Sequence, residues 1–257
     1  MWRGELTTGR LTLLVDIGNS RIKWATDRNG SLTRKGAIEH SQTEVEKALE
    51  EHWDSLNLPQ RIIVSNVAGE RVATGVSQYC LAKWARAPSF VTVTSAACGV
   101  QNGYASPQQL GVDRWIALIA AWDRFRFAAC VVDCGTALTI DALSHDGHHL
   151  GGIIAPGLTL MKKALCSGTH ALKDDRSGCP RLLANSTQDA IAAGSFFALT
   201  ALIDSFVDKV QRKLSAPVHT ILTGGDAPAL LPCLATRAVL DTELILRGLA
   251  VVARARS

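Results

Sequence analysis

Two short stretches of this chain combine an aspartate, a glycine and small polar residues in the same order. Residues 15–25 read VDIGNSRIKWA and residues 132–142 read VDCGTALTIDA, so Asp16 and Asp133 stand at equivalent positions. Each stretch follows an apolar run, which predicts a buried strand, a tight turn opened by glycine, and a second strand. Such a turn brings backbone N–H groups close to a phosphate, and the aspartate can hold a cation. The alternative is a chance recurrence of an ordinary Asp-x-Gly turn.

The residues around these turns could add contacts to a bound phosphate. Asn19, Ser20 and Thr136 supply polar side chains. Arg21 and Lys23 share one face of the strand after the first turn, where they either reach a phosphate or are simply solvated. The chain contains neither Gly-x-x-x-x-Gly-Lys-Ser/Thr nor Gly-x-Gly-x-x-Gly, which argues against a P-loop and a dinucleotide-binding site.

A carboxylate and a guanidinium follow a glycine where a polar loop meets an apolar helix. Asp113 and Arg114 come directly after Gly111-Val112. A carboxylate there can take a proton from a hydroxyl, while the guanidinium binds an anionic group of the same substrate. Tyr104, in the preceding loop, could close over that substrate. The alternative is that Asp113 caps the helix and Arg114 is a surface charge.

Two further glycine clusters lie in the second half of the chain. Residues 151–157 read GGIIAPG, and residues 223–226 read TGGD. The first is typical of a strand that ends in a rigid turn before a helix. The second closes a late strand, where a nucleotide could rest against the backbone of the two glycines.

Strands alternate with helices along the chain, which indicates an α/β fold. We expect strands at residues 11–16, 21–26, 61–67, 90–94 and 218–226, with a restart of the pattern from residue 128. We expect helices at residues 42–53, 69–86, 157–167, 187–213 and 241–255, and one that starts near Asp113. The repeated opening predicts two similar lobes, residues 1–122 and residues 123–257, with the final helix a candidate to pack on the first lobe.

The composition is that of an ordinary globular protein, with 47% hydrophobic residues, 19% charged residues and a net charge of +4. No dense basic stripe with interleaved aromatic residues is present, so nucleic acid is not expected as a partner. We expect no apolar run near the roughly 18 residues that span a bilayer, and no signal-peptide core, which predicts a cytoplasmic protein without a membrane partner. The seven cysteines form no Cys-x-x-Cys pair, which predicts reduced thiols rather than a disulfide framework or a zinc site.

Taken in order, five motifs resemble those of type III pantothenate kinases, a family that shares the actin-like ATPase fold with sugar kinases and heat-shock chaperones. The motifs are Asp16-x-Gly-Asn-Ser, Gly111-x-Asp113-Arg114, Asp133-x-Gly-Thr-Ala-x-Thr139-x-Asp141, Gly151-Gly-x-Ile-x-Pro-Gly157 and Thr223-Gly-Gly. The resemblance covers nearly the whole chain and implies two similar ribonuclease-H-like lobes with a cleft between them. It also implies an enzyme that uses ATP to phosphorylate pantothenate, the first step towards coenzyme A.

The resemblance further implies a role for each matching residue. Asp113 would take the proton of the pantothenate hydroxyl, Asp133 would hold a monovalent cation such as potassium or ammonium, and Asp16 would lie near magnesium. The expected contacts with ATP are Asp16, Ile17, Gly18, Asn19, Ser20, Arg21, Ile22, Lys23 and Thr136. The expected contacts with pantothenate are Tyr104, Gly111, Val112, Asp113, Arg114 and Thr187. Family members are dimers, so we expect a homodimer whose second subunit helps close the pantothenate pocket.

The match has departures and leaves two alternatives. Ser20 stands where the family usually has threonine, and residues 166–182 carry nothing over from the family. The alternatives are a regulatory accessory protein on the same fold and a kinase of another small alcohol. A complete set of phosphate, cation and acid–base residues favours catalysis over the first, and the Gly-x-Asp-Arg match favours pantothenate over the second.

Overall fold

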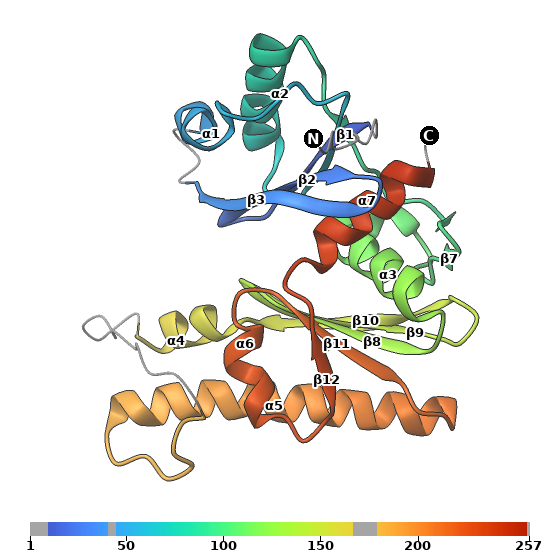
Figure 1. Ribbon diagram of the computed structural model, residues 1–257. Helices are drawn as coiled ribbons and strands as arrows, with labels where there is room; N and C mark the ends of the chain where they lie inside the picture. The colour runs from blue at the N-terminus through green and yellow to red at the C-terminus, as the bar shows by residue number, and fades with distance from the viewer. Residues whose placement is uncertain (1–9, 41–44, 167–178, 256–257) are drawn as a thin grey trace, which may run out of the picture. The chain divides into compact units, whose positions relative to one another are not determined.

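The computed structural model describes residues 10–40, 45–166 and 179–255, and its elements form two compact units (Figure 1). As far as they are described, Met1–Val93, Leu110–Ile116 and Ile245–Ser257 make up the first unit. The second unit consists of Thr94–Gln109 and Ala117–Leu244. A single boundary between residues 122 and 123 differs from this division, because the chain passes between the units several times.

The first unit is built on a five-stranded sheet in the order β3-β2-β1-β4-β5. Its strands are β1 (Leu11–Ile17), β2 (Arg21–Arg28), β3 (Ser31–Glu39), β4 (Arg61–Asn66) and β5 (Ser89–Phe90). The central strand β1 is buried along its whole length, and it pairs antiparallel with β2 and parallel with β4. A run of apolar residues such as LTLLV is typical of a strand covered on both faces.

Helices cover both faces of this sheet (Figure 1). Helices α1 (Val45–Trp53) and α2 (Glu70–Trp84) bury one face, where Trp53 contacts Trp24 edge-on and stacks on Trp84. Helix α7 (Leu244–Ala255) lies on the other face, where the Ala253 carbonyl accepts a 2.7 Å hydrogen bond from Arg61. An added Cβ at Gly248 of α7 would collide with the carbonyl of Ile116, so only glycine allows this close approach. These contacts make α7 part of the first unit although it comes last in the chain.

The second unit repeats the same topology in the order β10-β9-β8-β11-β12. Its strands are β8 (Ala129–Cys134), β9 (Ala137–Leu143), β10 (His149–Pro156), β11 (His219–Thr223) and β12 (Ala238–Leu240). As in the first unit, the first strand pairs antiparallel with the second and parallel with the fourth. Helices α4 (Leu158–Cys166), α5 (Thr187–Leu214) and α6 (Ala227–Leu230) pack on one face of this sheet (Figure 1). The sequence prediction of a repeated α/β lobe is therefore confirmed by the strand order.

The segment before the second sheet completes this unit. It holds a small ribbon of β6 (Ala96–Ala97) and β7 (Val100–Gln101), the 3₁₀ turn η1 (Pro107–Gln109) and the later part of α3 (Val112–Phe125), whose residues as far as Ile116 belong to the first unit. The N–H of Gln101 donates a 3.0 Å hydrogen bond to the carbonyl of Gly147. This bond ties the segment to the turn between β9 and β10, which explains why it does not group with the residues that precede it.

Helix α5 corrects one expectation from the sequence. In the described part of the chain it is the one helix long and apolar enough to cross a membrane, so the expectation of no such run was wrong. Its buried residues recur every three or four positions, from Ala193 to Val210, and pack in the core of the second unit. This spacing is typical of a core helix of a folded domain.

Most predicted elements are confirmed, and the differences have a simple cause. The strand expected at residues 90–94 shrinks to β5, and the helix expected at 42–53 is described only from Val45 onward. Strands β3 and β12 were not predicted. Most residues of β3, which reads SLTRKGAIE, are exposed, so this edge strand lacks the apolar alternation that marks a strand in sequence.

The prediction that all cysteines are reduced was wrong for one pair. Cys179 and Cys233 form a disulfide, and their Cα atoms lie 5.9 Å apart. The two residues are 54 positions apart in the sequence, so no spacing motif marks them. Among the described residues the free cysteines are Cys80, Cys98, Cys130 and Cys134, and burial raises the pKa of the Cys80 and Cys130 thiols to about 12. The side chain of Cys166 lies outside the described part.

Candidate functional site

The first aspartate turn lies at the carboxyl end of the central strand of the first unit. Asp16 pairs with Lys23 on the antiparallel neighbour and with Ser65 on the parallel neighbour, so all three side chains lie on one face of the sheet. Asp16 is only 6% exposed and Ser65 is fully buried. Ile17 and Ile22 lie on the opposite face, in the core beneath α1 and α2. At this end of the sheet, successive residues of a strand therefore point to opposite faces, with Asp16 on a polar side and Ile17 in the apolar core.

The turn itself is open to solvent. The N–H of Gly18 donates to the carbonyl of Arg21 at 3.0 Å, and Asn19 and Ser20 at the tip are exposed. His40 closes the other side, with its Nε2 2.8 Å from the carbonyl of Gly18. This arrangement leaves the polar tip accessible to a ligand.

The two basic residues after this turn have different surroundings. Arg21 forms a 2.7 Å ion pair with Glu39, and both side chains are more than half exposed. Lys23 is partly buried and lies directly opposite Asp16. Of the two, Lys23 has the better position for a phosphate contact, while Arg21 matches the solvated alternative.

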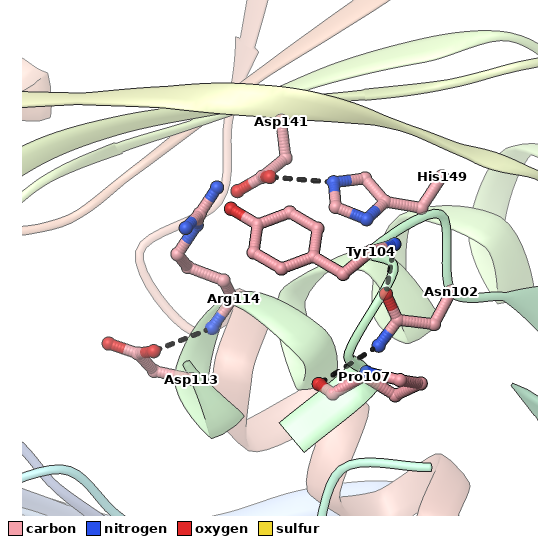
Figure 2. Close-up of polar contacts among 7 residues, drawn as sticks. All are labelled: Asn102, Tyr104, Pro107, Asp113, Arg114, Asp141 and His149. Atoms are coloured by element: carbon pink, nitrogen blue, oxygen red, sulfur yellow. Dashed lines mark hydrogen bonds and ion pairs between the residues drawn. The ribbon is translucent and has the colours of Figure 1, made fainter. Parts of the chain in front are cut away.

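The predicted acid–base pair begins α3, also in the first unit. The N–H of Trp115 donates a 3.0 Å hydrogen bond to the carbonyl of Gly111, which is the first bond of the helix. One carboxylate oxygen of Asp113 accepts the backbone N–H of Arg114 at 2.8 Å (Figure 2). An added Cβ at Gly111 would lie 2.6 Å from that oxygen, so glycine leaves room for the carboxylate. The Arg114 side chain is buried, which excludes the alternative of a simple surface charge.

The position of Asp113 only partly matches a helix cap. Val112 and Asp113 are the first two residues of α3, so Gly111 rather than Asp113 stands at the cap position. The carboxylate nevertheless accepts an N–H of the first turn and lies at the positive end of the helix dipole. Both effects hold a negative charge at a defined place, as a general base requires.

The second aspartate turn is one residue shorter than the first. Ile17 pairs with Ile22 across the first turn, whereas Cys134 pairs with Leu138 across the second. Asp133 therefore lies opposite Thr139, at the place where Asp16 lies opposite Lys23. Ala25 and Ala142, the last residues of the two stretches as quoted above, are consequently not at equivalent places in the two sheets.

Glycines from both later clusters pack around this second turn. An added Cβ at Gly157 would collide with the carbonyl of Gly135, and one at Gly224 would collide with the carbonyl of Cys134. The Cβ at Gly224 would also lie 2.5 Å from a carboxylate oxygen of Asp133, and its φ of +95° is unfavourable for other residues. The two glycine motifs, far apart in sequence, thus meet at one turn.

The residues opposite Asp133 on both neighbouring strands, Thr139 and Thr223, carry hydroxyl groups, and oxygen atoms are the ligands that hard cations prefer. Asp133 lies opposite Thr223 on β11, and the N–H of Asp226 donates a 2.9 Å hydrogen bond to the carbonyl of Cys134. The charges of Asp133 and Asp226 add to burial in raising the pKa of the Cys134 thiol. No cluster of three or more His, Cys, Asp or Glu side chains suited to a metal occurs among the described residues. A cation held here would therefore have at most two carboxylates, with hydroxyl and carbonyl oxygens as its other ligands.

The loop with Tyr104 is held firmly in the second unit. Asn102 organises it, because its Oδ1 accepts the N–H of Tyr104 at 3.0 Å and its Nδ2 donates to the carbonyl of Pro107 at 3.3 Å (Figure 2). The Tyr104 ring stacks on the ring of His149, whose Nε2 lies 2.8 Å from Asp141 Oδ1. His149 was not predicted as a site residue, because a lone histidine before Leu-Gly-Gly matches no motif.

The remaining predicted residues lie at the surface of the second unit. Thr136 is exposed at the tip of its turn. Thr187 is the first residue of α5 and is exposed, and the preceding Ser186 caps the helix by accepting the N–H of Asp189 at 3.1 Å. Helix α5 packs on the opposite face of the sheet from Asp133.

Comparisons with known proteins agree on a family and a fold. The family model described as type III pantothenate kinase matches residues 12–209. A protein of Nitrosococcus oceani named type III pantothenate kinase is 40% identical over 95% of this chain and 94% of its own length. A solved structure described as a Baf family transcriptional activator from Campylobacter jejuni is 25% identical, with a TM-score of 0.59 over 94% of this chain and 98% of that one. A ROK family glucokinase from Streptomyces griseus, with glucose and AMPPNP, shares the fold at 13% identity and a TM-score of 0.53, covering 95% and 99%.

Proposed function

The chain belongs to the type III pantothenate kinase family, and from that premise we propose which residues carry its reaction. The enzyme phosphorylates pantothenate with ATP, in the biosynthesis of coenzyme A. Its fold is that of actin-like ATPases and sugar kinases. The family membership supports this activity over the two alternatives left by the sequence, a regulatory protein and a kinase of another alcohol.

Asp113 is the proposed base for the pantothenate hydroxyl. The observation that carries this proposal is its place in the first turn of α3, where a backbone N–H and the helix dipole hold one carboxylate oxygen. Arg114, the buried cation beside it, is proposed to bind the pantothenate carboxylate. Gly111 and Val112 would contact the same substrate through their backbone, and Tyr104 and Thr187 through their side chains.

The ATP phosphates are proposed to contact the two aspartate turns. The first turn would contribute residues Asp16 to Lys23, with the N–H groups and exposed side chains of its tip, and the second would contribute Thr136. Lys23 would neutralise part of the phosphate charge, because it lies on the polar face opposite Asp16. Phosphoryl transfer depends mainly on such positioning and charge neutralisation.

Two cations are proposed at different turns. Magnesium commonly uses one or two carboxylates together with substrate phosphates, and Asp16 supplies one such carboxylate. When bound, magnesium would withdraw charge from the transferring phosphoryl group. Potassium or ammonium would be held at Asp133, which lies opposite Thr139 on β9 and Thr223 on β11.

The assembly and location of the enzyme are proposed from the family. We propose a homodimer in the cytoplasm, with neither nucleic acid nor membrane as a partner. A mixing experiment tests the dimer: inactive Asp113→Asn subunits are combined with inactive Thr187→Arg subunits under exchange conditions. If the two residues complete one pocket from different subunits, the mixture regains activity that neither homodimer shows. A fully active monomer in solution would contradict the proposal.

The central experiment replaces Asp113 by asparagine, which keeps the shape of the side chain but cannot take a proton. Loss of a general base typically lowers turnover by about a hundredfold to ten-thousandfold. ADP release with pantothenate measures this loss, and circular dichroism checks the fold. Asp123→Asn is the matched control, because Asp123 is a more exposed carboxylate on the same helix. A folded Asp113→Asn enzyme with near-normal turnover would reduce Asp113 to a helix-stabilising residue.

A further inference from the structure

A buried histidine–aspartate pair in the second unit has no part in the roles assigned above. His149 begins β10 and Asp141 lies on β9, and their side chains are 0% and 3% exposed. The Nε2 of His149 lies 2.8 Å from Asp141 Oδ1. A buried polar pair is weak evidence for stability alone, since apolar residues of similar size often stabilise as well. We therefore expect the pair to hold a neighbouring group in place.

The pair supports the loop that carries Tyr104. The rings of Tyr104 and His149 stack at 5.5 Å with an angle of 18° between their planes (Figure 2). Gly103 passes so close to His149 that an added Cβ would collide with the His149 carbonyl. On the same hairpin, the N–H of Gln101 donates to the carbonyl of Gly147 at 3.0 Å. The contacts of Gln101, Gly103 and Tyr104 thus hold the loop at one position on the hairpin of β9 and β10.

The geometry also assigns the proton of the imidazole. Nε2 faces a carboxylate oxygen, so it carries the hydrogen and donates it. Nδ1 is buried and has no hydrogen-bond partner in the described part of the chain. The hydrogen bond to Asp141 therefore sets the orientation of the imidazole, and the face of the ring lies against Tyr104.

We propose that Asp141 and His149 are positioning residues that fix the ring of Tyr104 for binding pantothenate. The chain of contacts runs from Asp141, which orients the imidazole, to His149, which supports the phenol ring. A ring fixed before the substrate arrives loses less conformational freedom on binding, so the pair would strengthen pantothenate binding without touching ATP. This inference rests on the proposed role of Tyr104 in the substrate site.

Two substitutions at His149 each remove one of its two contacts, the ring stacked on Tyr104 or the hydrogen bond to Asp141. His149→Gln keeps an amide donor for Asp141 but removes the ring, and His149→Phe keeps a ring but removes the donor. Each should raise the KM for pantothenate by about threefold to tenfold, the usual range for an aromatic contact, with KM for ATP and kcat nearly unchanged. Asp141→Asn, which still accepts the imidazole hydrogen, should stay within about threefold of the parent enzyme. His148→Gln is the control, because the neighbouring His148 is half exposed.

A double-substitution cycle distinguishes positioning from general stability. In a Tyr104→Ala enzyme, His149→Gln should raise the KM for pantothenate no further, because the ring it supports is already absent. If Tyr104→Ala leaves that KM unchanged, the proposed role of Tyr104 fails. If Tyr104→Ala raises it and His149→Gln does not, the positioning proposal alone is overturned. Equal rises in the KM for pantothenate and the KM for ATP also overturn the positioning proposal, and so do additive effects in the cycle. If His149→Phe does not fold, the proposal is tested with His149→Gln and Asp141→Asn.

Discussion

The two aspartate turns occupy the same place in two sheets of the same strand order, yet they are built differently. The first turn has an open tip, with Asn19 and Ser20 exposed. The second turn also has an exposed tip, at Thr136, but Gly157 and Gly224 approach its backbone so closely that neither has room for a side chain. The same topology therefore supports an accessible turn in one unit and a tightly packed cradle in the other. An accessible turn suits a ligand that enters and leaves, whereas a packed cradle suits an ion held at a defined distance.

The residues opposite the two aspartates also differ, because one is charged and the other is neutral. Lys23 lies opposite Asp16, and Thr139 lies opposite Asp133. A positive charge beside Asp16 favours phosphate oxygens at that turn, whereas neutral oxygen ligands beside Asp133 favour a cation. The one-residue difference in turn length brings these residues into register, so the contrast depends on backbone geometry as well as on residue type.

The largest expected effect comes from exchanging each aspartate for asparagine. Asp16→Asn should lower kcat by about a hundredfold or more and raise the magnesium concentration needed, because it removes a carboxylate from the metal. Asp133→Asn should abolish activation by potassium and leave the magnesium dependence unchanged. Rates are measured in Tris buffer with added sodium, potassium or ammonium chloride. Equal rates in all three salts for the parent enzyme would contradict the assignment of a monovalent cation to Asp133.

A smaller effect is expected from filling the cradle of the second turn. Gly224→Ala places a Cβ against Cys134 and Asp133 at a positive φ, and overpacking with backbone strain should destabilise the protein by about 3 kcal/mol. Gly225→Ala is the matched control, because nothing lies within 4 Å of an added Cβ there. Urea unfolding of both variants measures the difference. Equal stabilities of the two variants would mean that the second turn accommodates a Cβ at Gly224, which would contradict its close packing.

The smallest effect distinguishes the two basic residues after the first turn. Lys23→Ala should raise the KM for ATP by about tenfold, as expected when a charged contact with a bound phosphate is lost. Arg21→Ala should change it by less than about twofold, because an exposed ion pair such as that with Glu39 contributes little. Steady-state kinetics at two salt concentrations tests both. A larger effect at Arg21 than at Lys23 would reverse the roles given to them.

Local patterns determined much of the fold and of the candidate site. The apolar strand before Asp16 and the glycine after it predict a strand and a turn from neighbouring residues alone. The cap at Ser186 and the helix after Gly111 are likewise short-range features, which depend on hydrogen bonds within one turn of helix. The two-lobe repeat could be recognised because each lobe opens with the same local pattern.

Only the tertiary structure decided what depends on residues far apart in the chain. Gly224 meets Asp133, Cys179 bonds to Cys233, and Tyr104 rests on His149, and none of these pairs has a spacing that a sequence motif records. The polar edge strand β3 and the burial of one side of α5 also depend on what packs beside them. Hydrogen bonds within a turn are specified by adjacent residues, whereas packing between strands and loops is specified only when the whole core has formed.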